Sequence, residues 1–93
     1  MIKSFAGKFA EKVWTGAVGK GFPANLVRSS QRKLVMIDNA AILDDLRVPP
    51  SNHLEALKGD RAGQHSIRIN DQWRICFVWK EDGAHDVEIE DYH

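Results

Sequence analysis

The sequence predicts a small α+β domain in which N-terminal helices pack on a twisted, mostly antiparallel sheet. In the first half of the chain, apolar residues recur at three- and four-residue steps, which is typical of helices. In the last third they alternate with polar residues, which is typical of strands. A proline pair, Pro49-Pro50, separates the two patterns. Helices followed by consecutive strands favour the α+β class, and a length of 93 residues indicates one domain, 1–93.

The first half predicts two helices and one further helical turn. Met1–Phe5 reads as a short first strand, and Ala6–Trp14 carries aromatic and apolar residues at helical spacing. Three glycines then break the chain, and Pro23 suits the first turn of a second helix that runs to about Ala40. Its apolar stripe consists of Leu26, Val27, Ser30, Leu34, Ile37 and Ala41, whereas Arg28 and Arg32 fall on another face. Ile42–Arg47 is expected to add a short helical turn.

The second half predicts an antiparallel meander. Its expected strands are Leu54–Leu57, His65–Ile69, Trp73–Trp79 and Val87–Tyr92. Asp82-Gly83 is a hairpin-turn signal. If these two residues are the centre of the turn, the register places Arg74 opposite Asp91, Trp73 opposite Tyr92, and Gln72 opposite His93.

Composition argues against several classes of protein. The single cysteine, Cys76, forms no internal disulfide or cysteine-rich metal site, and its apolar neighbours predict a buried thiol. The four histidines have no metal-ligand spacing, so we expect no metal and no cofactor. No stretch approaches ~20 apolar residues and no signal peptide is recognised, which predicts a cytoplasmic protein.

The net charge of zero conceals a gradient along the chain. Residues 1–37 hold seven basic residues against one acid, whereas residues 81–93 hold six acids and neither lysine nor arginine. The basic segment could face RNA. The net charge of zero favours the alternative, a solvated helix surface that balances the acidic end of the same domain.

The predicted register gathers a guanidinium, a carboxylate, a phenol and an imidazole, from Arg74, Asp91, Tyr92 and His93. These groups suit cleavage of RNA by its own 2′-hydroxyl, which needs proton transfer and stabilisation of the charged phosphorus. The tyrosine ring could stack on an unpaired base. Each residue also has a structural explanation. His93 could be an exposed chain end, the Tyr92 ring could cover the core, and Arg74 could form a structural salt bridge with Asp91.

Three segments resemble a known family. The run Leu57–Ile75 (LKGDRAGQHSIRINDQWRI), the opening Met1–Phe5 and the ending Glu90–His93 closely resemble the HigB (killer-protein, GraT-like) branch of the RelE toxin superfamily. The resemblance implies a RelE-like fold and a toxin of a type II toxin–antitoxin pair that cuts mRNA in the ribosomal decoding site. It also implies a helix-turn-helix antitoxin (HigA-like) as partner, with operator DNA bound only through that antitoxin.

The resemblance also implies a site. The family's catalytic residues match Arg74, Asp91, Tyr92 and His93, and Lys58 matches a basic residue near them. Arg61 and Arg68, from the same run, are expected to bind RNA phosphates. Glu55 stands where relatives carry a histidine, so it becomes the alternative general base beside His93.

Two alternatives to the nuclease remain. The gyrase-inhibiting ParE branch shares the architecture but not the Asp-Tyr-His ending. A catalytically weak module that only binds the antitoxin is the other, because Glu55 replaces the histidine.

Overall fold

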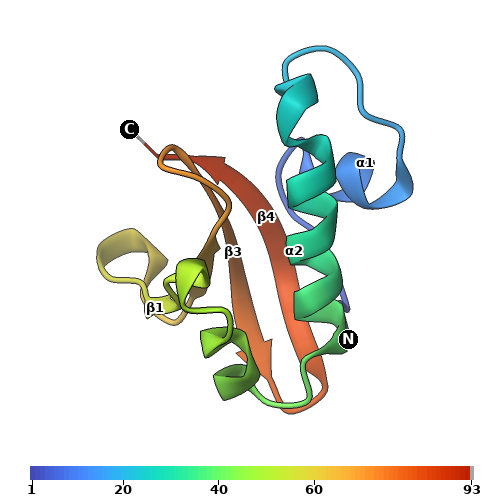
Figure 1. Cartoon of the computed structure of the whole chain (residues 1–93). Coiled ribbons are helices and arrows are strands. Elements are labelled where there is room, and N and C mark those ends of the chain that lie inside the picture. Colours follow the sequence, from blue (N-terminus) through green and yellow to red (C-terminus); the bar gives the residue numbers. More distant parts are fainter. Residues whose placement is uncertain (93) are drawn as a thin grey trace.

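A computed structural model describes residues 1–92. One long helix lies along a four-stranded antiparallel sheet of strand order β1-β2-β3-β4 (Figure 1). The helices are α1 (Ala10–Thr15) and α2 (Val27–Asn39), and the strands are β1 (Glu55–Ala56), β2 (His65–Arg68), β3 (Trp73–Lys80) and β4 (Gly83–Asp91). Short 3-10 turns connect them: η1 (Ala24–Leu26), η2 (Leu43–Arg47), η3 (Pro50–Asn52) and η4 (Gly59–Arg61). The predicted α+β class is confirmed.

Helix α2 is the element that the sequence predicted best. Its stripe residues Ser30, Leu34 and Ile37 are fully buried, and Arg28 and Arg32 are exposed on the other side. The predicted start at Pro23 is wrong, because Pro23 has an extended backbone with a ψ of 120° and precedes the η1 turn, and α2 begins only at Val27. Burial of one apolar stripe against the sheet is the main contribution to the stability of such a helix.

Helix α1 begins at Ala10, four residues later than the expected start at Ala6. Gly7 has a φ of 73°, a left-handed conformation that a right-handed helix cannot contain. The helix ends as expected at Gly16, whose left-handed backbone lets its N–H donate to the carbonyl groups of Lys12 and Val13.

The N-terminal segment follows the outer edge of β4 without forming a full strand. Ile2 pairs with Ala84 and Phe5 with Val87, each through a single parallel bridge. Between these bridges the Ser4 hydroxyl accepts a hydrogen bond of 2.8 Å from the Asp86 N–H. The expected first strand is therefore reduced to two bridges that border the sheet.

The predicted hairpin register is wrong. The turn is centred on Glu81-Asp82, because Lys80 pairs with Gly83, and this shifts the pairing by two residues from the predicted register. An irregularity between Cys76 and Val78 restores one of these two residues. As a result Arg74 lies opposite Glu90 and Trp73 opposite Asp91. Asp86, on the irregular side, has a φ of 51° and meets the N-terminal segment. A β-bulge of this kind inserts a residue and changes which side chains share a face.

The two faces of the sheet differ in chemistry. Trp73 packs on the helix side, where its ring centroid lies 5.9 Å from that of Phe9 and 5.2 Å from that of Phe22. Ile75 and Phe77 follow on the same face and are fully buried. The alternate side chains of β3 point to the opposite face, which we call the open face; it carries Arg61, Ser66, Arg74, Cys76, Glu88, Glu90 and Tyr92.

Candidate active site on the open face

Arg74 is the most firmly held residue of the open face. Its Nε donates to the Ser66 hydroxyl at 2.8 Å, and its Nη2 donates to the His53 carbonyl at 2.7 Å. Its side chain is only 13% exposed. The His53 carbonyl points toward Arg74 from a left-handed residue, with a φ of 46°, that follows the η3 turn. The guanidinium is therefore oriented by two separate elements before any ligand arrives.

Glu55 lies beside Arg74, with its Oε1 3.4 Å from Nη2. Its side chain is 55% exposed, so its carboxylate is accessible to a ligand on the surface. Strand β1 brings it there, because Glu55 pairs with Ser66, the residue that holds Arg74. The structure thus places two of the expected site residues in direct contact.

Tyr92 reaches back over the sheet toward the buried thiol of Cys76. Its hydroxyl lies 3.7 Å from the Cys76 sulfur. Burial raises the pKa of the Tyr92 phenol, and the neighbouring thiol raises it further, whereas the charges of Arg61 and Arg74 oppose this shift. Burial also raises the pKa of the Cys76 thiol. The predicted burial of Cys76 is confirmed, since none of its surface is exposed.

Arg61 binds two carboxylates on the far strand of the sheet. Its Nη1 lies 3.1 Å from Glu88, and its Nη2 lies 2.8 Å from Glu90. Burial lowers the pKa of Arg61, but the hydrogen bond that its guanidinium donates to Glu88 and the nearby negative charges outweigh it and raise the pKa overall. Burial and the charge of Glu88 raise the pKa of the Glu90 carboxyl, and Arg61 opposes them. This cluster was not foreseen, although the two-residue spacing of the glutamates on a strand is a sequence signal for one shared face.

The other two expected phosphate ligands come from the start of the η4 turn and from β2. Lys58 is exposed at the start of the η4 turn. Arg68 lies directly across from Arg74 on β2. Its guanidinium bonds to the Asp71 carboxylate and, through Nε, to the Asn70 carbonyl at 3.1 Å. Arg68 is thus close to the site but already has partners.

Asp91 is the expected site residue whose place differs most from the prediction. Because it pairs with Trp73, its side chain belongs to the helix side of the sheet, where it lines a small pocket with Gly7, Lys8 and Phe9. It does not lie beside Arg74, as the predicted register required. His93 falls outside the described residues.

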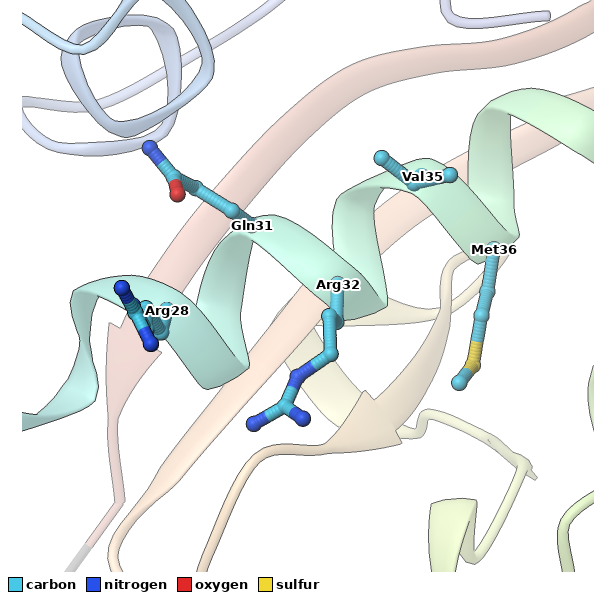
Figure 2. Close-up of a pocket in the computed structure, with 5 residues that line it drawn as sticks. All are labelled: Arg28, Gln31, Arg32, Val35 and Met36. Carbon is cyan, nitrogen blue, oxygen red and sulfur yellow. The ribbon is translucent and has the colours of Figure 1, made fainter.

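A separate groove lies on the outer surface of α2 and has a volume of about 540 Å³. Arg28, Gln31, Arg32, Val35 and Met36 line it, and Figure 2 shows their side chains projecting from both flanks of the helix. These side chains include no carboxylate, hydroxyl, thiol or imidazole, so the groove has no group for proton transfer near neutral pH. Among the described residues, no group of three or more His, Cys, Asp or Glu is placed to hold a metal ion.

Comparison with known proteins identifies the family. Residues 3–93 match the family described as the RelE-like toxin of the type II toxin–antitoxin system HigB. The chain belongs to the HigB-like toxins. It is 37% identical to the Endoribonuclease HigB of Proteus vulgaris over the full length of both chains. The toxin HigB-1 of Vibrio cholerae is 42% identical over 57 residues, which cover 61% of this toxin and 60% of that protein. An uncharacterized protein of Haemophilus influenzae is 35% identical over 68 residues, 73% of this toxin and 67% of that chain.

Proposed function

We propose that this toxin cleaves messenger RNA on the bacterial ribosome by metal-independent acid–base chemistry at the open face. The class of toxin follows from the family, and the endoribonuclease activity follows from the full-length likeness to the Proteus vulgaris enzyme. The observation that supports the location best is the oriented, mostly buried guanidinium of Arg74 beside Tyr92 and Glu55.

In the proposed reaction the ribose 2′-oxygen attacks the adjacent phosphorus. The bond between phosphorus and the 5′-oxygen breaks, and the products are a 2′,3′-cyclic phosphate and a free 5′-hydroxyl. One group must take the 2′-hydroxyl proton and another must give a proton to the leaving 5′-oxygen. General acid–base catalysis of this kind contributes typically ~10²–10⁴-fold.

Arg74 is proposed to bind the phosphate that becomes more negative as the reaction proceeds. Ser66 and His53 accept from its Nε and Nη2, and we propose that the phosphate binds the remaining nitrogen, Nη1. A guanidinium that is already oriented loses little entropy on binding and donates strongly to phosphate oxygens. A phosphate at Arg74 competes with Glu55 for the same guanidinium. We therefore assign Lys58 and Arg68 to neighbouring phosphates of the RNA, because Lys58 is exposed and Arg68 lies directly across from Arg74.

His93 is proposed as the main proton-transfer group, since it directly follows Tyr92 in the chain. Glu55 is the second candidate, because its exposed carboxylate can reach a 2′-hydroxyl bound near Arg74. The Tyr92 ring is proposed to stack on an unpaired base. Asp91 supports the terminus from the opposite face of the sheet.

The family implies an antitoxin partner. We propose that this antitoxin has a helix-turn-helix domain and that operator DNA is bound only through it. No helix among residues 1–92 is long and apolar enough to cross a bilayer. We place the toxin in the cytoplasm, because its proposed substrate is translated there.

The decisive experiment incubates the purified toxin with ribosomes programmed with a defined mRNA and maps the new RNA ends. Cyclic phosphate and 5′-hydroxyl ends, formed in the presence of EDTA and lost with Arg74→Ala, are the expected result. Intact mRNA, or cleavage that survives Arg74→Ala undiminished, would reject the proposed site. Intact mRNA together with blocked DNA supercoiling would instead place the toxin with the gyrase inhibitors.

A further inference from the structure

Arg61 connects the two outer strands of the sheet across the open face. It follows β1, the first strand of the sheet, and its guanidinium contacts Glu88 and Glu90 on β4, the last strand. Its Nη1 also donates to the Gln64 side chain at 2.9 Å. One guanidinium therefore joins the η4 turn to the opposite edge of the sheet.

The η4 turn has few other attachments. Strand β1 consists of two exposed residues that pair with β2 at Ser66 and His65. Beyond it, the Leu57 N–H donates to the Gln64 carbonyl at 2.9 Å, and η4 contains no buried residue. A short edge strand without buried side chains is held weakly. The contacts of Arg61 therefore restrain the turn that carries Lys58.

Tyr92 lies in the same cluster. Its hydroxyl lies 3.7 Å from the Cys76 sulfur, and Tyr92 follows Glu90, a partner of Arg61, by two residues, which places both side chains on one face. Glu88 faces Cys76 across the β3–β4 pair, and Glu90 faces Arg74. Without Arg61, the two carboxylates would repel each other and an RNA phosphate that approaches the open face.

We propose that Arg61 is a positioning residue of the RNA-cleaving site, whose bridge to Glu88 and Glu90 holds the Tyr92 ring and the Lys58 turn in place. This inference, which rests on the proposed function, replaces the expected phosphate contact of Arg61. Both outer nitrogens of the guanidinium already bond to carboxylates, and the Arg61 side chain is 29% exposed. A bidentate bridge needs the planar fork of arginine, which lysine lacks.

The test compares Arg61→Gln, Arg61→Lys and the triple variant Arg61→Gln/Glu88→Gln/Glu90→Gln with the matched control Arg47→Gln. Arg47 also has an acidic partner, Asp44, but both side chains are at least 66% exposed and lie away from the open face. Tyr92 is the only tyrosine, so a toxin labelled with 3-fluorotyrosine has a single ¹⁹F resonance that reports on its ring. Cleavage of ribosome-bound mRNA is measured on the same proteins, and circular dichroism checks their folding.

Arg61→Gln is expected to shift or broaden the ¹⁹F resonance and to lower kcat at least tenfold, whereas Arg47→Gln should change neither. Arg61→Lys should retain less than half of the kcat that Arg61→Gln loses. The triple variant should have a higher kcat than Arg61→Gln, because its carboxylates no longer repel each other. The proposal would be overturned if Arg61→Gln leaves the ¹⁹F resonance unchanged and raises KM, and if Arg61→Lys returns KM to the wild-type value. That result would assign Arg61 to phosphate binding. If Arg61→Gln does not fold, the ¹⁹F resonance and the kcat of Arg61→Lys provide the same test of the proposal.

The ¹⁹F measurement needs no substrate, so it separates this proposal from the proposed function. A wild-type toxin that leaves mRNA intact contradicts the function. A resonance that is insensitive to Arg61 contradicts the positioning role, whatever the activity.

Discussion

Arg74 lies directly across the β3–β4 pair from Glu90, and this relationship places Tyr92 on the open face and Asp91 on the helix side. The Arg74 guanidinium thus meets Ser66, His53 and Glu55, where the predicted register had supplied Asp91. The candidate site is a set of contacts among β1, β2, β3 and the turn that follows η3. The predictions below test these contacts one at a time.

Ser66→Ala should lower mRNA cleavage about tenfold and leave the fold intact. The substitution removes the buried hydroxyl that accepts from Arg74 Nε, and an unmet hydrogen bond of a charged donor costs about 1–3 kcal/mol. Single-turnover rates on programmed ribosomes provide the measurement. Ser29→Ala is the control, because Ser29 also uses its hydroxyl, here toward the Leu26 carbonyl, but lies on α2. Equal rates for the two variants would contradict an orienting role for Ser66.

Two substitutions of Tyr92 should distinguish the role of its ring from the role of its hydroxyl. If the ring stacks on a base, Tyr92→Phe should stay within about threefold of the wild type. Tyr92→Ala should lose about 1–3 kcal/mol of binding to the RNA. KM for the programmed ribosome is the informative quantity. If Tyr92→Phe raises KM as much as Tyr92→Ala does, the hydroxyl and not the ring makes the important contribution.

Deletion of His93 should abolish growth arrest without unfolding the protein, since it removes the main proposed proton-transfer group. Growth after induction and thermal unfolding of the purified chain are the two measurements. A truncated toxin that still stops growth would transfer the proton role to another residue, for which Glu55 is the first candidate. Glu55→Gln in the same truncated chain tests that alternative directly.

Gly83→Ala should destabilise the toxin by about 3 kcal/mol or more, as overpacking at a rigid contact does. A Cβ at this position would lie 2.1 Å from the Met1 carbonyl oxygen, and the glycine has a φ of 133°. Gly19→Ala is the matched control: nothing lies within 4 Å of its added Cβ, and it should change stability by less than about 1 kcal/mol. Urea unfolding of both variants measures the difference.

Stability should fall as the pH rises above about 8.5, where a free thiol begins to ionise. Burial raises the pKa of Cys76, so the folded chain keeps its proton at a pH where the unfolded chain has lost it. The unfolded state then binds fewer protons, and alkaline pH favours unfolding. Urea unfolding at a series of pH values should show a shallower decline for Cys76→Ala than for the wild type. Parallel curves for the two proteins would mean that the thiol does not contribute.

Much of the site follows from periodicity alone. Arg74 and Cys76 share a face because they are two residues apart on one strand, and the same holds for Glu88, Glu90 and Tyr92 on the next. The central run identified the family and its basic residues. Local patterns could not reveal that Ser66 and the His53 carbonyl orient Arg74, because these contacts join segments separated by 8 and 21 residues.

The sequence by itself determined the α+β class, the buried stripe of α2, the strands of the meander and the burial of Cys76. Each depends on the alternation of apolar and polar residues within one segment, which the chain carries locally. Only the tertiary structure decided which carboxylate faces Arg74. That choice depends on the turn at Glu81-Asp82 and on the irregularity near Asp86, where Ser4, 82 residues earlier, bonds to the strand. In an antiparallel pair a shift of one residue moves a side chain to the other face, so the register of β3 and β4 determined the composition of the site.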